Sequence, residues 1–600
     1  MDKKKRRLRT GRKARHNRKL IILTGIGVVV AVLFIVAMTM WLFISTGRVS
    51  DEGQDEAPYQ ASIEQTSISE IVYVQESVVD TIVNGGKRVS KALSERPETV
   101  EVTAEDAAEF GDLECQIVGT SNVEVNITSE GIPASDDKYY YLFEMATYED
   151  GIAADAEPLS KIYKGDDASF TIKLNKGLSN TRLFSKFAVA VKMEDQYVQV
   201  AHAKYITNPE KCAGYYYDSM DHDSIKGILP YPLRLDELSD LGVNYCAYNI
   251  PLSHILTTSG GIAYSYGGVT YHFNARIIND YDTLFKKLNS MGIDIAAIIL
   301  NDASTSAYPE ITHPSARSGS TAPYYMFNAA DESGVKALAA IGSFLAGRYS
   351  GSGHGNVSMW IIANEVNARR EYNYMSYTDV NTYTTAFTRA FRVFYNAIKS
   401  QNAGALVYIP LDQRWTYNTE STGDYDAKDV LDIFASSMND YGNVNWGLAA
   451  HPYSFPNDNT AFWKTSKYVN HTESTPCITM ENIEVLTNYM QKTNMLNPNG
   501  DVRSIILSEI GYSSTQGENL QAAAFAYAYT KMVQNGYIDA LMLSRQVDAP
   551  EEIAALGLAL GLETSSGSPK HLYFVFKYID DPDKRDEVCA FAYDIIGKKF

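Results

Sequence analysis

Short runs of apolar residues alternate with longer amphipathic stretches from about residue 210 to the C-terminus. Apolar runs of this length are typical of buried strands, whereas apolar residues recurring every three or four positions are typical of helices. We predict strands at 226–229, 243–250, 293–300, 357–364, 405–410, 445–451, 503–509 and 538–544, and helices at 281–291, 334–349, 379–400, 427–439 and 519–536. Eight strand–helix units are the count of a (β/α)8 TIM barrel, so we predict an α/β barrel over residues 208–600.

Two stretches leave this count open. The first strand, at 226–229, is short, and Cys477-Ile-Thr-Met480 within 454–501 also has the pattern of a strand. Counting it would give nine strands, so we interpret 454–501 as an insertion after the sixth strand. The glycine-containing loop at 253–274 is predicted to form a hairpin after the second strand, where it would wall the substrate cleft.

Residues 110–207 have a different pattern, in which apolar and polar positions alternate over short stretches. Val123-Glu-Val-Asn-Ile127 and Phe170-Thr-Ile-Lys-Leu174 are examples. Several short strands of this kind predict a small all-β sandwich of the immunoglobulin or fibronectin type III kind, placed before the barrel. Such a unit is either a structural spacer, which we favour, or a carbohydrate-binding module. Residues 47–109 are rich in Glu, Asp, Ser and Gln and are expected to form a linker or stalk.

The N-terminal region has the pattern of a membrane anchor. Residues 20–46 carry no charge and are long enough to span a bilayer, and residues 1–19 contain eleven Lys or Arg. The positive-inside rule then places a basic tail in the cytoplasm, a transmembrane helix at 20–46, and the body outside the cell membrane. The alternative is a cleaved signal peptide, but its apolar region is about 7–15 residues long and ends at a small-residue site. The longer span and the missing site favour the anchor.

Charge and cysteine content exclude several classes of function. The whole chain has a net charge of −19, and residues 1–19 carry +10, so the remainder carries −29; such an acidic body argues against nucleic acid as a partner. Five cysteines without a CxxC or Cys/His cluster indicate neither a zinc site nor a disulfide framework, although one incidental disulfide stays open. The chain contains no P-loop, dinucleotide fingerprint, HExxH or nucleophile elbow, so we expect no metal and no cofactor.

Two of the predicted strands end in a glutamate. Glu365 follows the fourth strand and Glu509 ends the seventh, each after an apolar run. Burying an unpaired carboxylate costs free energy, so a glutamate at the end of an apolar strand suggests a functional role. Because catalytic groups of TIM barrels lie at the C-terminal ends of strands, both carboxylates are expected at one mouth. Strict alternation places Glu365 on the inward face with Ile361 and Ala363, and Glu509 with Ile505 and Leu507. Glycoside hydrolysis is the main chemistry that uses such a pair.

Asn364-Glu365 at the fourth strand and Ser508-Glu509-Ile-Gly511-Tyr512 at the seventh resemble the clan-A glycoside hydrolase superfamily of (β/α)8 barrels. As a whole, the chain is similar to an uncharacterised bacterial family with a membrane anchor and a glycosidase-like barrel. The resemblance implies a retaining mechanism, with Glu365 as the acid/base and Glu509 as the nucleophile. It also implies that Asn364 holds the sugar 2-hydroxyl.

Further residues follow from the same resemblance. Members often place a His or Tyr after the sixth strand to hydrogen-bond the nucleophile or contact the sugar, which implies these roles for His451 and Tyr453. A sugar-stacking Trp often follows the eighth strand, but here Arg545 stands there. Arg545 either binds an acidic sugar or pairs with Asp548.

Tryptophans elsewhere are candidates for stacking on a sugar. Trp415 follows the fifth strand and Trp463 lies in the insertion, and each is either a stacking platform or a packing residue. Trp360, just before the fourth strand ends, is expected in the core.

The sequence therefore predicts a membrane-anchored, extracytoplasmic retaining glycoside hydrolase that acts on a poly- or oligosaccharide. A catalytically inactive carbohydrate-binding or cell-surface scaffold protein that kept the barrel is the alternative. A third possibility is that both glutamates are ordinary surface or helix-capping acids.

Overall fold

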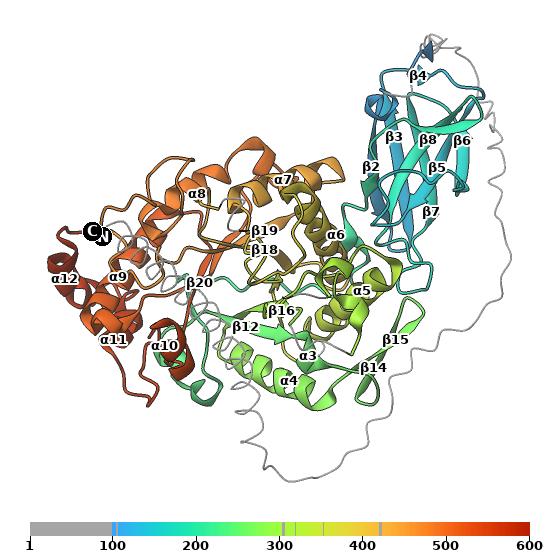
Figure 1. Ribbon diagram of the computed structural model, residues 1–600. Helices are drawn as coiled ribbons and strands as arrows, with labels where there is room; N and C mark the ends of the chain where they lie inside the picture. The colour runs from blue at the N-terminus through green and yellow to red at the C-terminus, as the bar shows by residue number, and fades with distance from the viewer. Residues whose placement is uncertain (1–98, 104–105, 303–306, 318–319, 352, 419–422) are drawn as a thin grey trace, which may run out of the picture.

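The computed structural model describes residues 99–600 except 104–105, 303–306, 318–319, 352 and 419–422 (Figure 1). The predicted cytoplasmic tail at 1–19, the predicted transmembrane helix at 20–46 and most of the linker at 47–109 lie outside the described residues. Among the residues that are described, no helix is both long enough and apolar enough to cross a membrane.

Eight parallel strands close into a barrel. They are β11 (Lys226–Ile228), β12 (Tyr245–Pro251), β16 (Asp294–Leu300), β17 (Met359–Ile362), β18 (Leu406–Asp412), β19 (Trp446–His451), β20 (Ile505–Ile510) and β21 (Ala540–Leu543). The short β11 pairs with both β12 and β21 and so closes the ring. The predicted α/β barrel is confirmed.

Helices surround this barrel in Figure 1. The main ones are α4 (Ala275–Ser290), α5 (Glu332–Arg348), α6 (Val380–Lys399), α7 (Ala427–Asp440) and α9 (Glu518–Asn535), followed near the C-terminus by α10 (Pro550–Leu556), α11 (His571–Tyr578) and α12 (Arg585–Ile596). Side chains of Asn274, Asp331 and Asp379 accept hydrogen bonds from backbone N–H groups in the first turns of α4, α5 and α6, which explains where these helices begin.

The stretch at 454–501, all of which is described, adds no strand to the barrel. It forms the short helix α8 (Ile483–Tyr489) with 3₁₀ turns at Met480–Asn482 and Thr493–Met495. Cys477 makes only an isolated bridge to Arg414. The interpretation of this stretch as an insertion after the sixth strand is confirmed.

Apolar side chains fill the inside of the barrel. Ile298, Ile361, Tyr408, Ile506 and Met542 come from different strands and pack together there with almost no exposure. A barrel packed in this way leaves no room for substrate within it, so chemistry is confined to the ends of the strands.

The loop after β12 forms the predicted hairpin, which consists of β14 (Ile262–Tyr266) and β15 (Val269–Phe273). Phe273 stacks on Phe344 of α5, with ring centroids 3.7 Å apart. The backbone N–H of Gly267 donates to the carbonyl of Gly177 at 3.1 Å. These contacts fasten the hairpin both to the helical layer and to the sheets that precede the barrel.

Two antiparallel sheets precede the barrel, and we refer to residues 111–206 as the sheet unit. One sheet contains β2 (Gly111–Val118), β3 (Asn122–Ser129) and β7 (Asp167–Lys173), and the other contains β5 (Tyr139–Met145), β6 (Ser160–Tyr163), β8 (Lys186–Met193), β9 (Gln196–Gln199) and β10 (Lys204–Tyr205). Every second residue of β3 is buried, as the alternating pattern of this strand leads one to expect.

The sheet unit and the barrel share one apolar core. The buried Arg392 of α6 donates to the backbone carbonyls of Ile206 at 2.9 Å and Gly442 at 2.7 Å, and burial lowers the pKa of its guanidinium to about 10. Asn396 of the same helix donates to the carbonyl of Leu183 at 2.8 Å. Buried polar side chains need hydrogen-bond partners. Because Arg392 and Asn396 each find one in the sheet unit, these bonds fix the orientation of the sheet unit relative to the barrel.

Candidate active site

Glu365 reaches the mouth of the barrel through an unusual backbone path. β17 ends at Ile362, and Ala363 and Glu365 then have positive φ angles of 70° and 35°. The predicted alternation is wrong here: Ile361 lies inside the barrel, whereas Ala363 packs in the outer core. Left-handed conformations cost a non-glycine residue on the order of 1–3 kcal/mol, and such costs are concentrated at functional sites.

Glu509 reaches the same mouth by means of a β-bulge. Ile506 lies inside the barrel, and Ile505 and Leu507 pack in the outer core, which is the reverse of the predicted inward face. Strict alternation would therefore turn Glu509 outward. The pairing of β20 with β21 shifts register between Leu507 and Ile510, and a bulge of this kind re-aims the side chains beside it.

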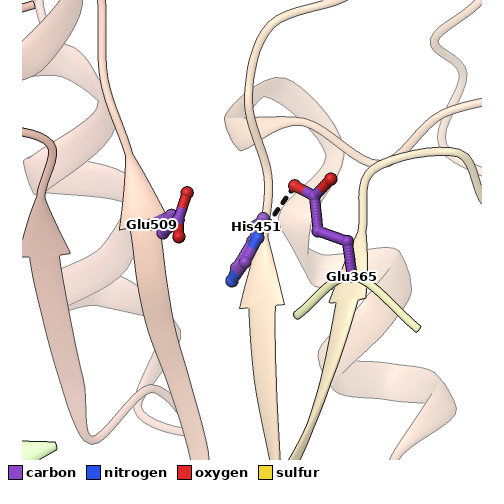
Figure 2. A group of neighbouring side chains, drawn as sticks. All are labelled: Glu365, His451 and Glu509. Carbon is purple, nitrogen blue, oxygen red and sulfur yellow. Dashed lines mark hydrogen bonds and ion pairs between the residues drawn. The ribbon is translucent and has the colours of Figure 1, made fainter. Parts of the chain in front are cut away.

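His451, at the end of β19, joins the two strand ends. Its Nδ1 lies 2.9 Å from Oε1 of Glu365, and its Nε2 lies 2.9 Å from Oγ of Ser508. In a neutral ring, Nδ1–H donates to the carboxylate and Nε2 accepts from the serine hydroxyl. Figure 2 shows His451 between the two glutamates, with its bond directed at Glu365. His451 therefore bonds to Glu365, and both of its ring nitrogens have partners.

Tyr453 makes the contact with the second glutamate instead. Its hydroxyl donates to Oε2 of Glu509 at 3.4 Å. The sequence assigned His451 and Tyr453 jointly to the nucleophile or the sugar, and the structure divides them, one to each carboxylate.

The two carboxylates lie close together. One oxygen from Glu365, one from Glu509 and one ring nitrogen of His451 are all within 4.8 Å of one another. These are also the atoms that would hold a metal ion in this part of the chain. Since each nitrogen of His451 already has a hydrogen-bond partner, a metal would have to break one of these bonds.

The surroundings shift the pKa values of Glu365 and His451. Burial raises the pKa of Glu365 to about 6, and the bond from His451 opposes that rise. Burial alone would lower the pKa of His451, but the Glu509 and Glu365 carboxylates outweigh it, and the pKa is raised. Glu365, only 8% exposed, therefore keeps its proton to a higher pH than an ordinary glutamate.

Asn364 is 9% exposed and directly precedes Glu365. Trp415 does not fit its expected role as a stacking platform. It is only 2% exposed, its indole N–H donates to the carbonyl of Glu473 at 3.0 Å, and Tyr489 packs edge-on against its ring. The face of Trp415 is therefore covered by protein. Trp463 is partly exposed and packs against Phe462.

Arg545 forms an ion pair, but not with the predicted partner. Its Nε lies 3.2 Å from Oε2 of Glu552 on α10. Asp548 instead pairs with the buried Lys570 at 2.8 Å. The expected Arg545–Asp548 pair is wrong because the turn into α10 brings the more distant Glu552 against the arginine.

Two tyrosines at the mouth were missed by the sequence reasoning. Burial raises the pKa of Tyr372 well above its ordinary value, with further contributions from Glu365, Glu371 and Glu509. Burial also raises the pKa of Tyr324, and Glu509 adds to the effect. Their rings are 6.5 Å apart. Both follow a barrel strand, β17 and β16 respectively, and aromatic residues in such loops were the signal that could have identified them.

Comparisons with solved structures find glycoside hydrolases, the class that the sequence resembles. A family 39 glycoside hydrolase from Bacteroides cellulosilyticus WH2 is 15% identical, with 78% of this chain and 83% of that chain covered and a TM-score of 0.41. A family 1 β-glucosidase from Thermotoga maritima is 12% identical, with 57% and 84% covered and a TM-score of 0.36. Fungal β-1,4-galactanases are 15% identical, with 60% and 93% covered and a TM-score of 0.35. Likenesses this distant transfer no activity to this chain.

No curated protein matches the sequence. A family of unknown function, DUF5722, matches residues 218–600, which include the whole barrel and both strand-end glutamates. The chain belongs to this family.

Proposed function

We propose that this chain is a retaining glycoside hydrolase, with Glu365 as the acid/base and Glu509 as the nucleophile. The observation that carries the proposal is the pair of strand-end carboxylates, which have an oxygen of each within 4.8 Å at one mouth. Carboxyl groups of retaining enzymes lie about 5–5.5 Å apart, whereas inverting enzymes need about 6.5–9.5 Å to admit a water molecule.

The different surroundings of the two carboxylates support different roles. Glu365, with a pKa raised to about 6, holds a proton that it donates to the glycosidic oxygen as that bond breaks. Glu509 attacks the anomeric carbon and forms a glycosyl ester. Glu365, now ionised, takes a proton from water, which attacks the same carbon and releases Glu509. The two steps together return the site to its starting protonation state.

His451 and Tyr453 act through these carboxylates as positioning residues. The bond from His451 to Glu365 fixes the direction of the acid, and the bond to Ser508 fixes the ring itself. Tyr453 holds Glu509 by its hydroxyl. A hydrogen bond to a carboxylate is stronger when the carboxylate is ionised. The bonds from His451 and Tyr453 therefore stabilise the ionised forms of Glu365 and Glu509, which each residue adopts at one stage of the reaction.

The first product should have the same anomeric configuration as the substrate. We expect NMR spectra, recorded during turnover of a glycoside that the purified protein accepts from an aryl-glycoside and oligosaccharide panel, to show retention before mutarotation. A first product of inverted configuration would remove the nucleophile role from Glu509.

A binding protein without turnover is the second candidate. It is favoured by the position after β21, where Arg545 stands in an ion pair with Glu552 in place of a sugar-stacking aromatic residue. Saccharide binding without release of product over the whole panel would select this candidate.

We also propose the topology that the sequence suggests: a cytoplasmic tail at 1–19, an anchor at 20–46, a stalk at 47–109, a β-sandwich spacer at 110–207 and an extracellular barrel at 208–600. The uncharged span beside a basic head supports it. Protease added to intact cells is expected to release the body and leave a fragment with residues 1–45 in the membrane. Recovery of the body from the medium with a new N-terminus near residue 46 would instead show cleavage.

A further inference from the structure

The described parts of the loops after β17, β18 and β21 contain four arginines. Arg369 donates to the backbone carbonyls of Gly423 and Met375, and the other three each pair with a carboxylate. Arg545, which follows β21, pairs with Glu552 at 3.2 Å. Arg370, five residues after Glu365, pairs with Asp424 at 3.2 Å. Arg414, which follows β18, pairs with Asp412. A guanidinium whose charge is balanced by a nearby carboxylate attracts a further anion less strongly than an unpaired one.

Carboxylates remain in excess at this mouth. Among the described residues, the side chains that bond to Glu365 and Glu509 are His451 and Tyr453, and neither is an arginine. Burial raises the pKa of Glu552, and the nearby Glu509 carboxylate adds to that rise. The charge that an incoming ligand meets is therefore negative, and a ligand with its own carboxylate would be repelled.

The remaining walls are aromatic and neutral. Tyr324 and Tyr372 are partly exposed, and each lies near enough to Glu509 for that carboxylate to raise its pKa. A tyrosine presents an apolar ring face and a hydroxyl that both donates and accepts hydrogen bonds. This combination suits the C–H faces and hydroxyl groups of a sugar and offers no charge to a uronate.

We infer that this site takes a neutral sugar next to the scissile bond and excludes the corresponding uronic acid. The inference rests on the proposed function, which places the sugar next to Glu365 and Glu509. It concerns the preference for a neutral over a charged sugar, which a binding experiment measures independently of turnover. Arg545 is the residue whose pairing decides it, because release of Arg545 would place a free guanidinium beside Glu509.

The test compares matched pairs of 4-nitrophenyl glycosides, such as glucoside with glucuronide and galactoside with galacturonide, on the full protein. We expect kcat/KM to be roughly 100-fold or more higher for the neutral member of any pair that reacts. Ligand-detected NMR with the free sugars should show the same order of binding. Uronides that react or bind as well as their neutral partners would overturn the inference and leave the hydrolase proposal intact.

Binding measurements also distinguish failure of the hydrolase proposal from failure of the proposed preference for neutral sugars. Binding of neutral sugars without turnover would support charge selection while the hydrolase proposal fails, and absence of binding by both classes would overturn both. In Glu552→Gln, which frees Arg545, the preference for the neutral member should fall roughly tenfold. Asp586→Asn, an equal change of charge on the exposed part of α12, should leave the preference unchanged. An unchanged preference in Glu552→Gln would contradict the role of Arg545.

Discussion

Glu509→Ala is expected to lower kcat by roughly 10⁴-fold or more on every substrate, because it removes the carboxylate that attacks the anomeric carbon in the proposed mechanism. Added azide or formate should restore part of the turnover. The small anion occupies the space left by the carboxylate and attacks the face that Glu509 would have attacked, so the product should be a glycosyl azide or formate of inverted configuration. Product analysis by NMR gives both the rate and the configuration.

Glu587→Ala is the matched control, since it removes the same atoms from an exposed position on α12. It should leave kcat unchanged and give no response to azide. Full activity in Glu509→Ala would show that this carboxylate is not the nucleophile.

Glu365→Ala is expected to divide substrates by their leaving groups. Natural glycosides leave as alkoxides and need a proton, so their kcat/KM should fall by about 10²–10⁴-fold. Aryl glycosides with an acidic phenol leave without that proton, and their first step should be largely spared. Azide should then give a product of retained configuration, because it attacks the glycosyl-enzyme formed on Glu509.

The pH dependence checks the same assignment. With a pKa raised to about 6 by burial, Glu365 loses its proton as the pH rises through that value, so wild-type kcat/KM for natural glycosides should fall above pH 6. This falling limb should be absent in Glu365→Ala. If the two anion-rescue products had exchanged configurations, the roles of Glu365 and Glu509 would be reversed.

The barrel was predictable because its signal is repeated. Apolar strand runs recur eight times with amphipathic helices among them, and an error of a few residues at any boundary leaves the strand count unchanged. Both glutamates were found for the same reason, since each follows a well-defined apolar run.

The orientation of these glutamates was not predictable from alternation. The positive φ angles of Ala363 and Glu365 and the register shift in β20 are local departures from regular geometry, and the alternation of apolar and polar residues does not mark them. Alternation grouped Glu509 with Ile505 and Leu507 on the inward face, but those two residues pack in the outer core. The two departures coincide with the two carboxylates, which is where a fold is expected to depart from local rules.

Side-chain partners depend on parts of the chain far away in sequence. Trp415 is covered because α8 brings Tyr489 against it, and Arg545 meets Glu552 because α10 folds back over the end of β21. Residue type and spacing along the chain carry no signal for such contacts. Tyr324 and Tyr372 were overlooked in the same way, because they become neighbours only when two loops meet above adjacent strands.

The single core that joins the sheet unit to the barrel bears on how this protein can change over generations. A barrel that folds independently of the adjacent domain can be recombined with other domains. Here, removal of the sheet unit would leave Arg392 and Asn396 buried without the carbonyls of Ile206 and Leu183. The family match begins at residue 218, yet the shared core extends before it into the sheet unit. Exchange of the sheet unit between relatives therefore requires a replacement whose backbone carbonyls meet the same side chains of α6.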